Sequence, residues 1–324
     1  MSSLKELKKP ISSELKEFQK IFRLSVKSSV PLLDVIMNYI LKAKGKQIRP
    51  LIVLYSAAMF EGINESTHRA ATLIELLHTA TLVHDDVVDE SDRRRGRFSI
   101  NALWKNKIAV LAGDYLLSRG MLTALQAKDY NVLEIVSEAV KEMSEGELLQ
   151  IEKARKLDID ETVYYEVIRK KTASLLASCF AAGASSACKN EEDIKKMWDI
   201  GEYAGMAFQI KDDLLDFEKS SVTGKPTGID IKEKKMTLPL IHLLSQSSIL
   251  KKRKIINIIK RHNTNKQKVS WIMNEVEISG GIEYAKNKMT EFKSSSLNLL
   301  REYPESSSRL ALEQIIEFTI DRKK

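Results

Sequence analysis

The chain has 324 residues, a formal net charge of +8, 43% hydrophobic residues and 30% charged residues, a balance typical of a soluble globular protein rather than a disordered or fibrous one. No apolar run approaches the ~18 residues that a membrane span needs, and no linker-like segment divides the chain. We therefore expect a single domain over residues 1–324 without a transmembrane segment.

Helices are favoured throughout, because 13 Gly and 6 Pro residues are few for a fold with many tight turns. Apolar spacing of three and four residues predicts helices over residues 12–42 (restarting at Pro31), 51–60, 66–89, 107–127, 131–154, 160–187, 191–217 and 236–247. Gly45 and Pro50 bracket a basic turn. The segments 92–99, which is basic and contains Gly96, and 218–235 are expected to be loops. Gly280-Gly281 separates two later helices, and the last helix runs through Phe318. Since no segment alternates like a strand, we expect an all-α fold.

Three further features bound the function. The N-terminal segment is charged and amphipathic, so we expect no secretory signal, and Cys179 and Cys188 are expected to be free thiols in the cytoplasm. The basic run Lys251–Lys254, with Lys260 and Arg261, contains no aromatic residue, so we interpret it as a solvated helix face and expect no nucleic-acid partner. At most, a weak peripheral contact with anionic lipid headgroups is the alternative.

The DDxxD spacing occurs twice, at Asp85-Asp86-Val87-Val88-Asp89 and at Asp212-Asp213-Leu214-Leu215-Asp216. Carboxylates at i and i+4 share one helix face, where they repel each other, and the dipole at a helix C-terminus disfavours anions. A sequence that accepts both penalties twice predicts a bound cation, and oxygen ligands of this kind suit Mg²⁺ with substrate phosphate. The alternative, two solvated acidic faces, fits poorly because each cluster interrupts an otherwise apolar helix.

Basic residues supply the complementary charge. The first cluster is followed by Arg93-Arg94-Arg95, which Glu90 and Asp92 cannot neutralise completely, and arginine suits phosphate oxygens. Further candidate anion ligands are Lys46, Arg49, His78, Lys171, Thr172, Lys225 and Lys235. Any one of these residues, taken alone, could be an ordinary solvent-exposed side chain. Together with two metal clusters they indicate two anionic substrates bound side by side.

These motifs resemble those of the trans-polyprenyl diphosphate synthases, which are related to farnesyl and geranylgeranyl diphosphate synthases. The resemblance covers nearly the whole chain. It is carried by Gly45–Pro50 (GKQIRP), His84–Gly96 (HDDVVDESDRRRG), Ala112–Leu116 (AGDYL), Lys171–Ala173 (KTA), Phe208–Asp216 (FQIKDDLLD), Gly224–Pro226 (GKP), Lys235–Leu240 (KMTLPL) and the basic tail Ile320–Lys324. One departure is Lys234, where the family commonly has Gly. The resemblance implies a helical bundle around an apolar tunnel, and a homodimer.

The resemblance also implies residue roles. Isopentenyl diphosphate would bind Lys46, Arg49, His78 and Arg95. The allylic diphosphate would bind Arg94, Lys171, Thr172, Gln209, Lys225 and Lys235. Mg²⁺ would bridge it to Asp85, Asp89, Asp212 and Asp216, so that Asp85, Asp89, Lys171 and Asp212 would be the residues most directly involved in catalysis. The implied reaction is head-to-tail condensation, in which the departing pyrophosphate can accept the proton.

Product length is expected to depend on the residues one and two turns before Asp85. In short-chain members bulky aromatic residues close the tunnel there, whereas this chain has Ala80 and Thr81, with Leu77 deeper. We therefore expect a long product, plausibly a quinone side chain, although Ala80 could instead permit close helix packing. Met121 and Met143 are other candidates for the tunnel floor. The alternatives are a short-chain farnesyl or geranylgeranyl synthase, a terpene cyclase and a non-catalytic partner subunit.

Overall fold

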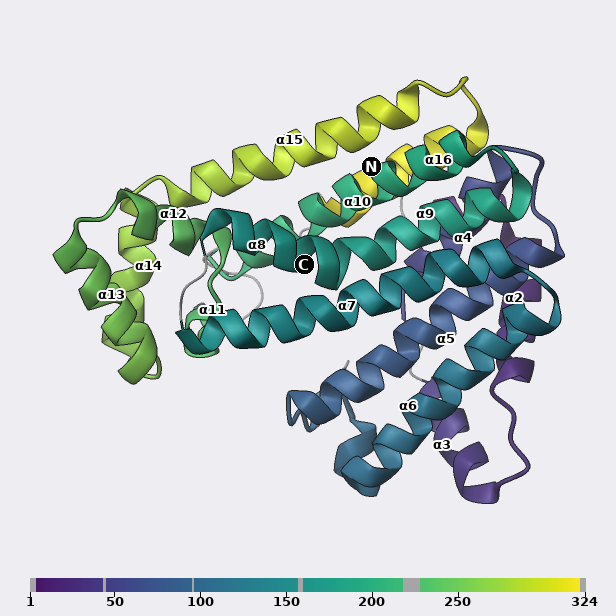
Figure 1. The fold of residues 1–324 in the computed structure, drawn as a ribbon, viewed down its shortest axis with the longest axis horizontal. Coiled ribbons are helices and arrows are strands. Elements are labelled where there is room, and N and C mark those ends of the chain that lie inside the picture. The colour runs from purple at the N-terminus through teal and green to yellow at the C-terminus, as the bar shows by residue number, and fades with distance from the viewer. Residues whose placement is uncertain (1–3, 43–44, 95, 157–159, 218–227, 321–324) are drawn as a thin grey trace. The chain divides into compact units, whose positions relative to one another are not determined.

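The computed structural model describes residues 4–42, 45–94, 96–156, 160–217 and 228–320 (Figure 1). The elements in chain order are α1 (Leu4–Lys8), α2 (Ser12–Ser25), α3 (Pro31–Lys42), α4 (Ile48–Ala58), α5 (Glu65–Val88), β1 (Arg93–Arg94), β2 (Arg97–Phe98), α6 (Ile100–Gln126), α7 (Tyr130–Lys156), α8 (Glu161–Ile168), the π-helical turn η1 (Arg169–Ala173), α9 (Ser174–Ala187), α10 (Glu191–Leu215), α11 (Ile229–Lys232), α12 (Leu238–Gln246), α13 (Ile249–Arg261), α14 (Lys266–Ile278), α15 (Gly281–Arg301) and α16 (Ser307–Ile320).

The all-α prediction is confirmed, with three local differences. The segment 218–235, expected to be a loop, contains the short helix α11 in its described part. Residues 93–98, expected to be a loop, form a two-stranded antiparallel hairpin in which Arg93 pairs with Phe98. The predicted helix over 160–187 contains the π-helical turn η1, a feature that apolar spacing does not indicate. Cys179 and Cys188, expected to be thiols, are not joined in a disulfide bond in the described part of the chain.

The chain forms two compact units. Unit 1 contains residues 1–140, 178–198 and 303–315, and unit 2 contains residues 141–177, 199–302 and 316–324. The first aspartate cluster belongs to unit 1 and the second to unit 2. The expectation of a single domain stays a prediction.

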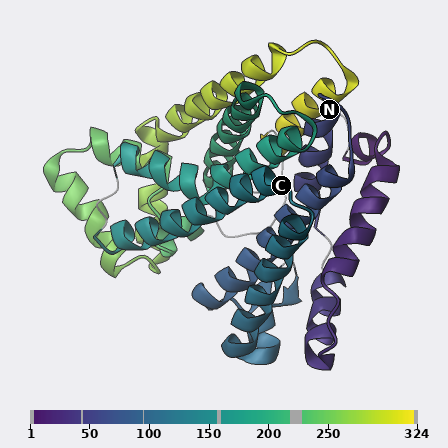
Figure 2. The ribbon, with the colours of Figure 1, turned by 45° about the vertical axis from the view of Figure 1, so that its right-hand side comes forward.

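Close packing of α5 against α6 organises unit 1 (Figures 1 and 2). α5 begins with a capping box, in which the side chain of Asn64 accepts from the backbone N–H of Thr67. On α6, a Cβ added at Gly113 would collide with the ring of His84, and one at Gly120 would come within 3.1 Å of Leu73 Cδ1. These glycines therefore let α6 approach the helix that carries the first aspartate cluster.

The opposite face of α6 is apolar and exposed. Its large exposed side chains are Leu103, Val110, Leu111, Met121, Leu122 and Leu125. Among the described residues, α6 is the helix long and apolar enough to cross a bilayer, judged by length and hydropathy alone. It differs in this from the expectation of no transmembrane segment, which was based on uninterrupted apolar runs. One face of α6 packs along α5, so the apolar composition of α6 also fits a core helix of a globular protein. Such a helix would have one apolar face in the core and a second one at the surface.

Unit 2 has its own hydrophobic core, built mainly from α8, α10 and α12 to α15. Ile210 and Leu214 of α10 are buried in it, so the apolar positions between the acidic residues fix the direction of that helix. α15 approaches α12 at Gly281, where an added Cβ would lie 2.5 Å from the carbonyl oxygen of Pro239. This core positions the second aspartate cluster at the end of α10.

Candidate active site

The first aspartate cluster lies at the C-terminal end of α5. The N–H of Asp89 donates to the carbonyl oxygen of Asp85 at 2.8 Å, so the helical register continues to Asp89, the C-cap residue. Asp85 is half-buried and Asp89 is exposed. The predicted sharing of one helix face by these two carboxylates is therefore consistent with the backbone geometry.

The middle aspartate of this cluster has a different role. Asp86 is only 4% exposed, and its Oδ1 accepts a hydrogen bond from Arg94 Nε at 2.7 Å. Its carbonyl oxygen accepts from Asn101 Nδ2 at 3.1 Å. Asp86 thus ties both the β1–β2 hairpin and the start of α6 to the end of α5. Arg93 lies 4.9 Å above the ring of Phe98 within the same hairpin.

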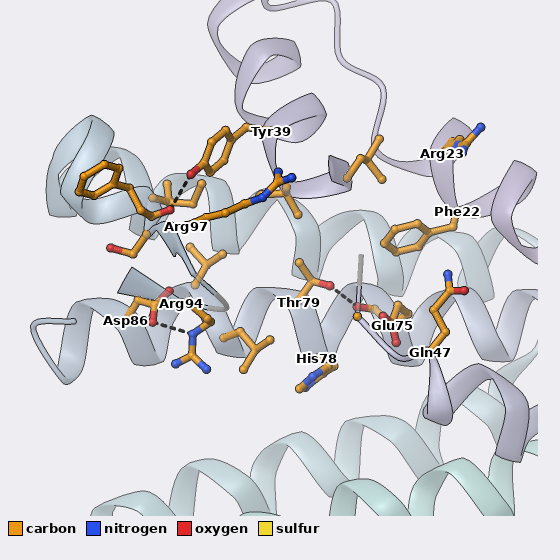
Figure 3. Close-up of a pocket in the computed structure, with 18 of the residues that line it drawn as sticks. Phe22, Arg23, Tyr39, Gln47, Glu75, His78, Thr79, Asp86, Arg94 and Arg97 are labelled. Atoms are coloured by element: carbon orange, nitrogen blue, oxygen red, sulfur yellow. Dashed lines mark hydrogen bonds and ion pairs between the residues drawn. The ribbon is translucent and has the colours of Figure 1, made fainter. Parts of the chain in front are cut away.

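A cavity of about 130 Å³ lies beside this cluster in unit 1 (Figure 3). It is lined by residues of α2, α3, the turn before α4, α5, the hairpin and the start of α6. His78 and Arg94, two of the predicted substrate ligands, line it together with Asp86 and the turn residues Gly45 and Gln47. Figure 3 shows Arg94 directed at Asp86. The walls of the cavity are mostly apolar, and the arginines that line it are Arg23, Arg94 and Arg97.

The other predicted isopentenyl diphosphate ligands lie near the same turn. Lys46 is exposed between Gly45 and Gln47, and Arg49 is half-buried in the first turn of α4. Gln47 has a φ of 57° and accepts a hydrogen bond from Gln19 Nε2 at 3.1 Å. Arg95 lies outside the described residues.

The predicted chain-length residues differ in their surroundings. Ala80 is fully buried in a hydrophobic cluster with residues of α6, including Ala112 and Leu116. This environment fits the interpretation that Ala80 permits close helix packing. Leu77 is also buried, whereas Thr81 is half-buried and its hydroxyl donates to the carbonyl oxygen of His78. The assignment of product length to these positions stays a prediction.

The other candidates for the tunnel floor are also on helices. Met121 of α6 is exposed, on the apolar face that points away from α5, and Met143 of α7 is half-buried. Because Met121 is exposed, it is a weaker candidate for the tunnel floor than the buried residues Leu77 and Ala80 of the same unit.

The second aspartate cluster resembles the first in sequence but not in surroundings. Asp212 is exposed on α10, whereas Asp216 follows the end of that helix. The two carboxylate oxygens of Asp216 accept from the backbone N–H groups of Ile229 and Asp230, at 2.9 and 3.1 Å. Asp216 therefore holds the start of α11, which gives it a structural role beside the predicted metal-binding one.

Asp213 is the centre of a buried hydrogen-bond network in unit 2. Its Oδ2 accepts from the hydroxyl of Tyr164 at 2.7 Å and its Oδ1 from Gln209 Nε2 at 2.9 Å. Gln209 Oε1 in turn accepts from the hydroxyl of Thr172 at 2.8 Å. Burial raises the pKa of Asp213 to about 7, although both hydrogen bonds act in the opposite direction. The network joins Thr172 and Gln209, two predicted allylic ligands, and fixes the orientation of the Gln209 amide.

Lys171 is held by residues that the sequence analysis did not identify. Its ammonium pairs with Glu147 at 2.5 Å and donates to Gln150 Oε1 at 3.3 Å, both on α7. A Cβ added at Gly146 would lie 2.8 Å from Lys170 Cβ and from the backbone nitrogen of Lys171, so glycine allows α7 to contact η1 directly. A glycine inside a predicted helix, between two glutamates, was the available signal. π-helical turns of this kind occur frequently at functional sites.

The segment after α11 carries the remaining predicted cation. Lys235 pairs with Glu233 at 2.6 Å and lies 3.9 Å from Asp230. Burial, followed by the charge of Asp216, raises the pKa of Asp230 to about 6. Lys234 has a φ of 60°, a left-handed conformation that favours glycine, so the family's usual residue fits this backbone better. Lys225 lies outside the described residues.

The fit of the two clusters to Mg²⁺ depends on how many of their carboxylates converge. Within either unit's described residues, no three His, Cys, Asp or Glu side chains converge closely enough to hold a metal ion alone. Mg²⁺ commonly uses one or two carboxylates and completes its shell with water and substrate phosphate. The pair formed by Asp85 and Asp89, and the exposed Asp212, fit that pattern.

Comparison with known proteins identifies the family of this chain. The family model described as polyprenyl synthetase matches residues 30–276. The chain is 34% identical to an octaprenyl diphosphate synthase of Haemophilus influenzae, covering 99% of this chain and 98% of that protein. It is 36% identical to the octaprenyl diphosphate synthase of Escherichia coli, covering 92% of each.

Solved structures give the same result. A decaprenyl diphosphate synthase from Rhodobacter capsulatus superposes with a TM-score of 0.93 at 30% identity, covering 99% of this chain and 100% of that one. A polyprenyl synthase from Caulobacter crescentus, complexed with calcium and isoprenyl diphosphate, gives a TM-score of 0.89 at 29% identity, covering 99% and 98%. The chain therefore belongs to the polyprenyl synthetase family, and it is a transferase with that family's all-α fold.

Proposed function

We propose that this protein is a Mg²⁺-dependent trans-polyprenyl diphosphate synthase. It adds isopentenyl diphosphate head-to-tail to an allylic diphosphate in the cytoplasm and makes a medium- or long-chain product for a quinone side chain. The observation that carries the proposal is the carboxylate pair on the last turn of α5, beside a cavity lined by His78 and Arg94. The names of its octaprenyl and decaprenyl relatives support a long product.

In unit 1, Asp85 and Asp89 would hold the metal ion, which when bound would supply positive charge against the leaving diphosphate. Arg94 is kept beside these carboxylates by its bond to Asp86, which uses Nε. The two terminal nitrogens of the Arg94 guanidinium bind the phosphate. Because the hairpin limits the motion of Arg94, this side chain loses less freedom on binding than a flexible one would.

Isopentenyl diphosphate binds at the turn before α4. Lys46 and Arg49 bind its diphosphate, with Arg95 as a further cation, and His78 donates from α5. Because His78 lines the same cavity as Arg94, the two substrates can be held close together. Proximity of this kind lowers the entropic part of the barrier.

In unit 2, Lys171, Thr172 and Gln209 bind oxygens of the allylic diphosphate, with Lys225 and Lys235 as further cations. Gln209 is oriented by Asp213, and Lys171 by Glu147 and Gln150. Donors that are already positioned stabilise developing charge without reorganisation at the moment of reaction. Asp212 would supply a carboxylate for a metal ion in this unit, with Asp216 as its neighbour.

The chemistry needs no side-chain base. The allylic C–O bond breaks, and its electron pair leaves with the diphosphate. The double bond of isopentenyl diphosphate attacks the allylic cation, and the proton lost from the adduct passes to the departing pyrophosphate. The apolar helix walls exclude water, which would otherwise capture the cation.

We further propose that the active form is a homodimer that pairs through α6. The support is the exposed apolar face that contains Val110, Leu111 and Leu122, since a monomer seldom leaves such a face uncovered. In light-scattering measurements, Leu111→Glu with Leu122→Glu should shift the protein to a monomer. Leu310→Glu, at an exposed leucine of α16, should leave the mass unchanged.

The decisive assay incubates the protein with isopentenyl diphosphate, each allylic starter in turn and Mg²⁺, followed by chromatography of the dephosphorylated products. Wild type should form long all-trans chains, and EDTA should abolish turnover. Asp89→Asn should reduce kcat by about 100-fold or more, because it removes a metal ligand, whereas Asp92→Asn, at an exposed carboxylate outside the DDxxD spacing, should retain activity.

The other outcomes have definite meanings. Short chains only would assign the protein to the farnesyl or geranylgeranyl class. A cyclic hydrocarbon without use of isopentenyl diphosphate would indicate a terpene cyclase. No turnover with any starter would leave a non-catalytic partner subunit and would refute the proposal.

A further inference from the structure

The helices α13 and α14 form an antiparallel hairpin in unit 2 (Figure 1). Two contacts fix the pairing: Lys251 forms an ion pair with Glu275, and Lys254 Nζ lies 4.1 Å from the centre of the Trp271 ring. Later residues of α13 thus meet earlier residues of α14. The start of α13 and the end of α14 therefore lie at the same end of the hairpin.

The outer face of this hairpin is strongly basic. α13 turns Ile255, Ile258 and Ile259 into the core of unit 2 and leaves the opposite side to solvent. Residues 249–278 contain eight Lys and Arg residues and two Glu residues, a net charge of +6 out of +8 for the whole chain. Since one glutamate pairs with Lys251, the cations of the outer face are only partly neutralised locally.

The end of the hairpin exposes large aliphatic side chains. Ile249, Leu250 and Ile278 are 72%, 78% and 71% exposed, more than any other large hydrophobic residue that the structure describes. Isolated exposed aliphatic residues are ordinary. Three at one end of a hairpin, adjoining a basic face, are not explained by the fold of unit 2.

We propose that this end of the hairpin docks on a membrane surface that contains anionic lipid. Ile249, Leu250 and Ile278 enter the boundary between headgroups and acyl chains, and the cations beside them face the headgroups. This arrangement matches the two components of peripheral membrane binding, apolar burial and attraction by anionic lipid. A nucleic acid would use the basic face but would leave the aliphatic end in water.

The inference goes beyond the proposed catalytic function and does not depend on it. The two are nevertheless compatible, since a long polyprenyl chain is insoluble in water and an enzyme that reaches a bilayer can release its product there. The docking surface contains none of the residues assigned to substrate or metal. Vesicle binding and turnover can therefore fail separately.

The test is co-sedimentation of the full chain with vesicles of phosphatidylcholine alone or mixed with phosphatidylglycerol. Wild type should bind only the mixed vesicles, and added salt should weaken binding. Lys252→Gln with Arg253→Gln, which removes two exposed cations next to Leu250, should lower partitioning by about 20-fold, at roughly fivefold per cation. Ile249→Ser with Leu250→Ser should lower it by about tenfold or more.

Matched controls carry the same substitutions elsewhere. Leu32→Ser with Val35→Ser changes two exposed aliphatic residues of α3, and Lys195→Gln with Lys286→Gln changes two exposed lysines of α10 and α15. Both should bind vesicles like wild type, and all four variants should keep wild-type turnover in solution. Equal binding to neutral vesicles, or an unchanged affinity of the Ile249/Leu250 variant, would overturn the proposal. Binding to a DNA duplex without binding to vesicles would assign the surface to nucleic acid instead.

Discussion

Replacement of Gly146 by alanine is predicted to damage catalysis far more than stability. Gly146 is the point at which α7 contacts η1, the turn that carries Lys171 and Thr172. A Cβ at this position would lie 2.8 Å from Lys170 Cβ and from Lys171 N, whereas ordinary van der Waals contact begins at 3.4 Å. Neither neighbouring atom is the end of a flexible side chain, so one backbone segment must move by more than half an ångström.

Two energetic effects act against each other in this variant. Alanine is better than glycine inside a helix by up to ~1 kcal/mol, while overpacking costs ~1–3 kcal/mol. The net loss of stability should therefore be about 2 kcal/mol at most. A displaced Lys171 affects the reaction more strongly, because a shift of ~1 Å in a positioning group can cost ~100-fold in rate. We expect kcat/KM for the allylic diphosphate to fall by about 10- to 100-fold.

The assay compares steady-state kinetics with urea unfolding for Gly146→Ala and for a control, Gly120→Ala. At Gly120 the nearest contact is Leu73 Cδ1 at 3.1 Å, the end of a flexible side chain that can turn aside. The control should keep wild-type kinetics. If Gly146→Ala also keeps a wild-type kcat/KM, the contact between α7 and η1 does not position Lys171, and the reasoning is wrong.

Four other substitutions test the site residues. Tyr164→Phe should lower stability by about 1–3 kcal/mol, because it removes a hydrogen-bond donor from buried Asp213. Since the pKa of Asp213 is raised to about 7, the contribution of this carboxyl group to stability is present at low pH and is lost as pH rises from about 4 to about 7. The hydrogen bond from Tyr164 lowers this pKa, so the variant should extend the loss to higher pH, as measured by urea unfolding without metal. Asp86→Ala should cost about 1–3 kcal/mol, since its arginine partner loses a charged hydrogen bond, and an unchanged urea midpoint would contradict this. Thr81→Phe should shorten the product, measured by chromatography, and leave the fold intact. Ala80→Phe should destabilise the protein by ~1–3 kcal/mol or more, measured by urea unfolding, because Ala80 is fully buried.

The long helices were predictable because their apolar spacing matches the faces that they bury. α4 is one example: almost every residue from Leu51 to Ala57 is buried, as its apolar run indicated. The β1–β2 hairpin was not predictable in the same way. It depends on a turn at Gly96, with a φ of 75°, and on the stacking of Arg93 over Phe98, and the basic residues around it read as a loop.

The site was predictable in its residue types but less so in its contacts. Spacing on a helix placed Asp85 and Asp89 together, and the resemblance supplied His78 and the allylic ligands. What the sequence could not give was the partner of each group. Lys171 meets Glu147 only because α7 passes η1 at Gly146, which is a contact between segments more than twenty residues apart.

The two DDxxD clusters show how equal sequence motifs acquire different partners in the fold. Their sequences are equivalent, but in each the middle aspartate is buried by a different partner, Arg94 for Asp86 and Tyr164 for Asp213. Their last aspartates differ further: Asp89 ends α5 in solvent, whereas the carboxylate of Asp216 accepts two backbone N–H groups of α11. A carboxylate with both oxygens already in hydrogen bonds has less capacity for a metal ion than an exposed one. Loss of Asp89 should therefore act mainly on metal binding, while loss of Asp216 should act first on α11 and on the lysine that follows it.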